Sequence, residues 1–199
     1  KPVIISTGMN TIKDIIKTYK HAKKFNKKII LMHCVSIYPT PPSKTMLDTI
    51  PFLKKKFGCP VGFSDHSADI SLAIASVSLG ANVIEKHFTV SKKWSGPDIS
   101  LSITPDKFRE MVKACKEVYL SKGIRKSVLK EEIPVTKFAY ASVVTTQDIK
   151  KGEKFSSKNI WVKRPGTGQI HAREFYKVIN KKSKKNLKKD YQLKYFDII

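Results

Sequence analysis

Two short apolar runs, each followed closely by a histidine, constrain the fold of this chain more than any other feature. The runs at 61–63 and 82–84 lead into polar sequences that contain His66 and His87. The segment 68–79 between them carries apolar residues at helical spacing. This order predicts a strand, a helix and a second strand. The two strands should be parallel and adjacent.

Both histidines are therefore expected just beyond the C-terminal end of a strand. Neighbouring strands lie about 4.8 Å apart, and α/β proteins bind their ligands at this edge of the sheet. Imidazole is the commonest metal ligand among side chains. His66 and His87 could thus ligate one metal ion, or each could be a hydrogen-bonded loop residue. The two residues alone leave both interpretations open.

The first 120 residues predict four strands that alternate with four helices. The polar or turn residues that follow each strand should gather on one face, which indicates a site there. A proline-rich stretch at 35–42 is expected to be a loop, because proline disfavours both helix and central strand. Such an order is typical of half of an eight-fold (β/α) barrel or of a small open sheet. The expected strands are 3–7, 29–34, 61–63 and 82–84, and the expected helices are 12–25, 46–57, 68–79 and 107–119.

The pattern changes after residue 120. Residues 121–138 form a polar, charged connector, and residues 139–199 combine strand-like runs with turns at Gly152 and at a Pro-Gly loop. We therefore divide the chain into residues 1–120, a linker at 121–138 and a small β-rich domain at 139–199. About sixty residues are few but enough for a domain that folds by itself.

The net charge of +23 comes from 39 basic and 16 acidic residues. Most of the excess is lysine, dispersed over predicted helix surfaces and the segment 181–189. No aromatic residues interleave with it as a nucleic-acid stacking platform requires. We therefore favour solvated lysine faces and no nucleic-acid partner. A basic nucleic-acid binder would show DNA affinity that depends steeply on salt.

Three widely spaced cysteines indicate a reducing compartment, hence a cytoplasmic location without disulfides. No apolar run is long enough to span a membrane, so no membrane partner is expected. The chain starts directly with a strand-like run, which suggests a fragment of a longer protein.

Five motifs resemble those of the sialic acid synthase (N-acetylneuraminate synthase) family, which includes legionaminic and pseudaminic acid synthases. They occur in order over essentially the whole chain, at 33–39, 62–66, 84–89, 96–98 and 162–166. The resemblance implies a (β/α)8 TIM barrel followed by an antifreeze-like (SAF) domain. The chain would be a partial barrel, strands five to eight, followed by that domain.

The resemblance also implies an activity. The family condenses phosphoenolpyruvate with an N-acetylated aldose, typically N-acetylmannosamine, and releases phosphate. His66 and His87 match two ligands of a divalent metal ion, Mn²⁺ in preference to Mg²⁺. The motifs do not separate N-acetylmannosamine from the acceptors of the legionaminic and pseudaminic acid synthases.

Six further residues match substrate-binding positions of the family. Ser64 and Ser36 would contact the phosphate or carboxylate, and Tyr38 and Asp98 would contact the sugar. In the family the SAF domain reaches the barrel of the partner subunit, which implies a domain-swapped homodimer. The matched residues there are Phe138 and Arg164, expected at the N-acetyl group.

Each of these residues also has a plain structural interpretation. Tyr38 could pack the proline loop, Asp98 could form a turn, and Arg164 could be a surface cation. The family's remaining phosphoenolpyruvate ligands and an acidic catalytic residue belong to the first four strands. We therefore expect the 199 residues alone to be inactive as a synthase. A non-catalytic remnant that binds sugar or a partner chain is the alternative.

Overall fold

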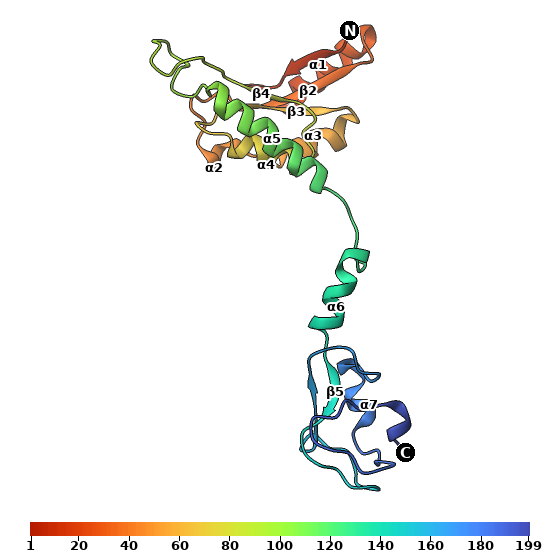
Figure 1. Cartoon of the computed structure of the whole chain (residues 1–199). Coiled ribbons are helices and arrows are strands. Elements are labelled where there is room, and N and C mark those ends of the chain that lie inside the picture. The colour runs from red at the N-terminus through yellow and green to blue at the C-terminus, as the bar shows by residue number, and fades with distance from the viewer. The chain divides into compact units, whose positions relative to one another are not determined.

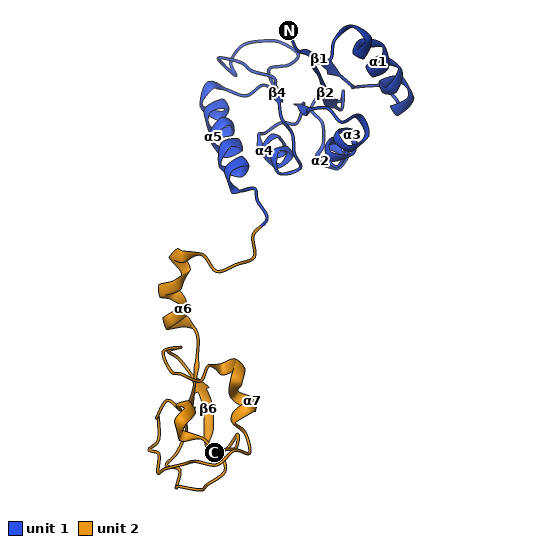
Figure 2. Cartoon of the chain, turned by 90° about the vertical axis from the view of Figure 1, so that its right-hand side faces the viewer, with its two compact units in different colours: residues 1–124 blue, residues 125–199 orange.

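The computed structural model describes residues 1–199 and divides into two compact units. The first comprises residues 1–124 and the second comprises residues 125–199 (Figure 2). Each unit has its own core of buried apolar side chains.

The first unit is built on a four-stranded parallel sheet in the order β1-β2-β3-β4 (Figure 1). Consecutive strands are neighbours, as expected for repeated β/α units. The predicted parallel α/β architecture and the adjacency of the two histidine-bearing strands are confirmed. The strands are β1 Val3–Ser6, β2 Ile29–Cys34, β3 Val61–Asp65 and β4 Ile84–Lys86, and the helices are α1 Ile12–Phe25, α2 Pro42–Thr45, α3 Thr49–Phe57, α4 Ser71–Ser78 and α5 Pro105–Ser121.

Helix α1 has the bounds expected from its periodicity, and Thr11 is its N-cap. The Thr11 hydroxyl donates to Asp14 at 2.5 Å, and the Asp14 backbone N–H donates back to the Thr11 hydroxyl at 3.4 Å. This capping box satisfies backbone donors that the first turn would leave unpaired. The Thr11 hydroxyl and the Thr11 backbone N–H both donate to the Asp14 carboxylate, and these two hydrogen bonds lower the pKa of the carboxyl.

The helix expected at 46–57 is α3, which begins three residues later than expected, at Thr49, and ends at Phe57 as expected. Met46 adopts a left-handed conformation, with φ of 51°, and ends a further short helix, α2, that the sequence pattern does not predict. The proline-rich stretch is a loop at 35–41, as predicted, and only its last residue, Pro42, belongs to a helix. Pro42 occupies the first turn of α2, where a missing N–H costs no hydrogen bond. Strand β3 is two residues longer than expected, and β4 begins two residues later.

Alternation along β2 and β3 separates a helix-facing side of the sheet from an opposite side. Leu31, Val61 and Phe63 pack into one buried cluster with Ile50 and Leu53 of α3. Residues at the alternate positions, among them the site residues described below, therefore face away from the helices.

The second unit begins with a 3₁₀ turn, Lys130–Glu132, and α6 Ile133–Ala139, so part of the polar connector is helical. Its strands β5 Ser142–Thr145 and β6 Ile160–Lys163 pair antiparallel, and α7 spans Phe175–Val178. Isolated bridges and two more 3₁₀ turns make up most of the remaining structure. The core of this unit consists of Val143, Ile149, Phe155, Ile160, Ile170, Phe175, Val178, Leu187 and Leu193.

No helix is long and apolar enough to cross a lipid bilayer. Cys34, Cys59 and Cys115 are free thiols. Burial raises the pKa of the Cys59 and Cys115 thiols, which disfavours their reactive thiolate forms.

His33 should make the stability of the first unit depend on pH. Its Nε2 lies 2.7 Å from the Thr45 carbonyl, and burial lowers the pKa of the ring. The folded state therefore binds a proton less readily than the unfolded chain, whose histidine pKa is about 6.5. His33 therefore contributes fully to the unfolding free energy of the first unit above pH about 6.5, and this contribution is lost as the pH falls below that value.

Unfolding free energies measured between pH 5 and 8 for the parent and His33→Gln test this. As the pH falls below about 6.5, the unfolding free energy of the variant should decrease less than that of the parent. His21→Gln, at an exposed position of α1, is the matched control and should leave the decline unchanged. An identical decline in His33→Gln would contradict the prediction.

Candidate functional site

His66 and His87 meet at the C-terminal edge of the sheet. His66 follows the last residue of β3, and His87 follows the last residue of β4. Their ring centroids are 5.2 Å apart and the rings are inclined at 66°. Ser64 pairs with Glu85, and Asp65 pairs with Lys86 in the parallel register. The next residue of each strand is therefore a histidine, and both rings emerge on the same side.

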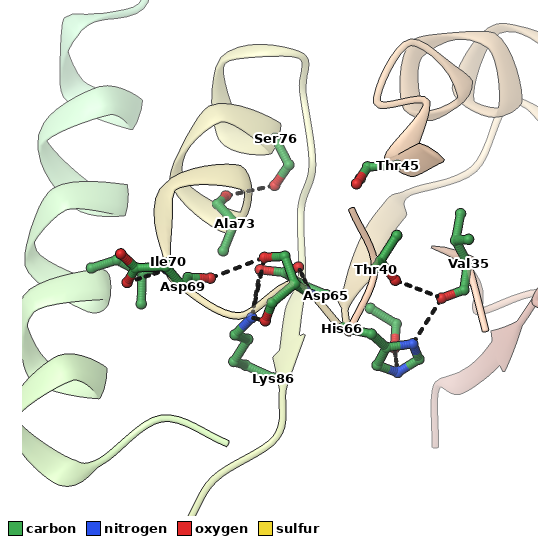
Figure 3. A network of polar contacts seen from close by, with 12 residues as sticks. Val35, Thr40, Thr45, Asp65, His66, Asp69, Ile70, Ala73, Ser76 and Lys86 are labelled. Carbon is green, nitrogen blue, oxygen red and sulfur yellow. Dashed lines mark hydrogen bonds and ion pairs between the residues drawn. The ribbon is translucent and has the colours of Figure 1, made fainter. Parts of the chain in front are cut away.

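The His66 ring is fixed by its neighbours (Figure 3). It is 7% exposed, and its Nδ1 lies 2.9 Å from the Val35 carbonyl oxygen. Because a carbonyl only accepts, Nδ1 carries the proton and Nε2 keeps its lone pair. Tyr38 stacks on the ring with centroids 4.3 Å apart. The ring is thus held in one orientation, with Nδ1 used by Val35 and Nε2 left for a ligand.

His87 is more open, with a side chain 28% exposed. Its Nδ1 lies 3.7 Å from an Asp98 carboxylate oxygen, which is longer than a hydrogen bond. The Tyr38 ring meets the His87 ring edge-on, with centroids 5.8 Å apart. Tyr38 and Asp98, both predicted sugar contacts, therefore lie beside the histidine pair.

Ser64 and Glu85 each lie two residues before a histidine, on the same side of the sheet as the histidines. The Ser64 hydroxyl donates to the Glu85 carboxylate at 2.6 Å and lies 3.5 Å from His66 Nε2. The proton of Ser64 is thus directed to Glu85. Its role as an anion contact stays a prediction.

Sequence reasoning assigned no role to Glu85. The available signal was its place two residues before His87, because side chains two apart on a strand point to the same side.

Ser36 lies at the end of β2, beside Cys34. Its hydroxyl oxygen is 3.8 Å from the Cys34 thiol, which lies 4.0 Å from His66 Nδ1. The loop after β1 approaches closely here: a Cβ at Gly8 would lie 2.6 Å from the Ser36 oxygen. A groove of about 530 Å³ runs along these strand ends and includes Ser36 and Asn10 in its lining.

Phe138 and Arg164 belong to the second unit. Phe138 is in α6 and 69% exposed, and Arg164 follows β6 at a cis bond to Pro165. Gly166 donates its backbone N–H to the Lys137 carbonyl at 3.0 Å, which ties the Arg164 loop to α6. The structure thus links the segments that carry these two residues within the second unit. Their predicted contact with an N-acetyl group stays untested.

The histidine pair fits a divalent metal ion. With metal–nitrogen bonds of about 2.0–2.1 Å, two imidazoles on one ion have ring centres roughly 5 Å apart. The Val35 carbonyl supplies the outer hydrogen bond that ligating histidines usually make. No cluster of three or more His, Cys, Asp or Glu side chains suited to a metal ion is present. Any further ligands of such an ion would therefore be water, substrate oxygens or groups outside this cluster.

Comparison with known proteins places both units. Residues 1–127 match the NeuB family, and residues 140–198 match the SAF domain. An N,N'-diacetyllegionaminic acid synthase of Campylobacter jejuni is 36% identical over 96% of this chain and 58% of its own length. A pseudaminic acid synthase of the same species is 36% identical over 94% of this chain and 55% of its own.

A solved structure is also similar, that of N-acetylneuraminic acid (sialic acid) synthetase from Leptospira borgpetersenii in complex with citrate. It has a TM-score of 0.62 and 32% identity over 67% of this chain and 48% of its own. The chain thus spans little more than half the length of the curated relatives it matches. The SAF match confirms the predicted identity of the C-terminal domain. The parallel α/β sheet, the SAF domain and these matches together show that the chain belongs to the NeuB family.

Proposed function

We propose that this chain is the metal-binding half of a phosphoenolpyruvate-dependent nonulosonic acid synthase. One observation carries the proposal: two imidazoles 5.2 Å apart at the ends of adjacent parallel strands, one of them held with its Nε2 lone pair free. In this proposal the four strands are the fifth to eighth of an eight-stranded barrel. The edge strand β1 supports this, because Val3 and Ile4 are 41% and 53% exposed.

The proposed reaction joins the methylene carbon of phosphoenolpyruvate to the aldehyde carbon of an N-acetylated aldose. Water adds to the former enol carbon, and the C–O bond to phosphate breaks, which gives a nonulosonic acid and inorganic phosphate. A divalent ion, Mn²⁺ in preference to Mg²⁺, supplies Lewis acidity toward the aldehyde oxygen when it is bound.

The residues of the first unit have distinct proposed tasks. His66 and His87 hold the ion, and the stacked Tyr38 ring prevents His66 from turning. Asp98, 54% exposed, accepts hydrogen bonds from sugar hydroxyls. Glu85 orients the Ser64 hydroxyl by accepting a hydrogen bond from it.

Anion binding and sugar recognition complete the proposal. Ser36 contributes a hydroxyl to the phosphoenolpyruvate anion from the loop after β2, two residues beyond Cys34, the register partner of Ser64. Arg164 and Phe138 contact the N-acetyl group in the barrel of a partner subunit. A homodimer in which SAF domains are exchanged is thus part of this proposal.

A phosphate-release assay with phosphoenolpyruvate and Mn²⁺ tests the function. We expect turnover by the full-length protein with at least one of three acceptors: N-acetylmannosamine and the two N-acetylated aldoses that the legionaminic and pseudaminic acid synthases use. Residues 1–199 produced separately should release no phosphate. Turnover by the separate 199 residues would refute the half-enzyme proposal. Absence of turnover by the full-length protein with all three acceptors would refute the synthase.

A further inference from the structure

A fully buried ion pair is formed by the two residues that precede the histidines, Asp65 and Lys86; Figure 3 shows it together with His66. Lys86 Nζ is 3.0 Å from an Asp65 carboxylate oxygen, and the two side chains are 0% and 1% exposed. Asp65 is the last residue of β3, and Lys86 is the last residue of β4. Each member of the pair thus immediately precedes one of the histidines.

The pair fixes the corner of the chain that follows β3. Lys86 Nζ also donates to the Ser67 carbonyl at 2.5 Å and lies 3.4 Å from the Ser67 hydroxyl. The other Asp65 oxygen accepts the Ser67 backbone N–H at 2.8 Å. Residues 65–67 are therefore tied to the end of β4 by a network in which the ammonium has three acceptors. His66 lies inside that corner.

The network sits on the opposite side of the sheet from the rings. Successive residues of a strand point to opposite sides, so Asp65 and Lys86 face the helices while His66 and His87 face away. Asp65 and Lys86 are also register partners across β3 and β4. A contact between them therefore holds the two histidine backbones side by side without touching the rings.

Stability alone gives little reason to bury this pair. Removing two charges from water costs several kcal/mol per ion, and well-packed apolar residues of similar volume are often as stabilising or more so. The pair offers a directional constraint that apolar side chains lack, because the ammonium position is set by three oxygen atoms.

We propose that Asp65 and Lys86 are positioning residues, which hold His66 and His87 at the separation that one divalent ion requires. The inference rests on the proposed metal site and deepens it, because it assigns the geometry of the site to two residues that touch neither ion nor substrate.

The main test is the double variant Asp65→Leu/Lys86→Met, which removes both charges and leaves neither one unpaired. In the full-length protein its unfolding free energy should be close to that of the parent, while its Mn²⁺ affinity should fall about 10–100-fold. Without metal, the ring NMR signals of His66 and His87 should shift, and that of the exposed His21 of α1 should not. A purely structural role would leave the Mn²⁺ affinity of the folded variant unchanged, and that result would overturn the proposal.

Asp65→Asn/Lys86→Gln is the second variant, needed if the first double variant does not fold. It keeps an acceptor for the Ser67 N–H, removes both charges and leaves neither one unpaired. We expect Mn²⁺ affinity to fall about tenfold. Unchanged affinity would again overturn the proposal.

Two controls separate this inference from the proposed function. Lys107→Met/Glu110→Leu removes an exposed ion pair of α5, 2.9 Å in length, and should leave Mn²⁺ affinity unchanged. His66→Ala tests the metal site itself. Loss of affinity in His66→Ala without loss in the Asp65 and Lys86 variants rejects only the positioning role. Unchanged affinity in all variants rejects the metal site and the positioning role together.

Discussion

Replacing His66 by alanine should lower Mn²⁺ affinity and turnover in the full-length protein by at least about tenfold, as expected for loss of a direct metal ligand. The structure gives the physical reason. The Val35 carbonyl fixes the proton on Nδ1, so the Nε2 lone pair is available, and the His87 ring lies 5.2 Å away. Calorimetric titration with Mn²⁺ and the phosphate-release assay measure the two effects.

Two further variants distinguish the loss of a metal ligand from a general loss of structure. His66→Gln retains an amide that can donate to Val35, so it should fold like the parent and still bind Mn²⁺ more weakly. His21→Ala removes an exposed histidine of α1 and should change neither affinity nor turnover. An unchanged Mn²⁺ titration in both His66 variants would remove His66 from the site.

Gly62→Ala should destabilise the first unit by about 2–4 kcal/mol, because overpacking a buried strand forces its neighbours to move. A Cβ at position 62 would lie 2.3 Å from the Met32 sulfur and 2.6 Å from the Val83 carbonyl oxygen. The methionine side chain can move. The carbonyl is backbone and accepts the Phe63 N–H at 2.8 Å, so its displacement strains the link between β3 and the segment that leads into β4.

Chemical denaturation of the parent and Gly62→Ala measures this effect. Gly62→Ala/Met32→Ala should recover only part of the loss, because the clash with Val83 persists. Gly123→Ala is the matched control, since a Cβ there meets no atom within 4 Å. A change in unfolding free energy of Gly62→Ala below about 0.5 kcal/mol, the range of ordinary surface substitutions, would contradict the prediction.

Much of the first unit could be predicted because its signals are local. The spacing of Ile12, Ile15 and Tyr19, with Thr11 before them, was enough to place α1. The late start of α3, at Thr49, could not be predicted, since a left-handed residue such as Met46 has no strong sequence signal outside glycine and depends on the packing around it. Strand ends also differed by two residues, because pairing with the neighbouring strand decides where β3 and β4 stop.

The candidate site also contains some residues that the sequence predicts and others that it does not. His66 and His87 were predicted from the ends of two apolar runs, and Tyr38 and Asp98 from the family motifs. Glu85 and the pair formed by Asp65 and Lys86 were not, although they stand beside the histidines in the same motifs. A charged residue next to a strand end is usually solvated, so the sequence alone predicts that these three side chains lie at the surface.

The order of strands and helices, the two domains and the identity of the metal-binding candidates followed from the sequence itself, because periodicity and side-chain chemistry are properties of short segments. Only the tertiary structure decided that two rings twenty-one positions apart lie 5.2 Å from each other, that Ser64 donates to Glu85, and that Lys86 is buried against Asp65. These facts depend on strand register and burial, which arise when distant segments pack together.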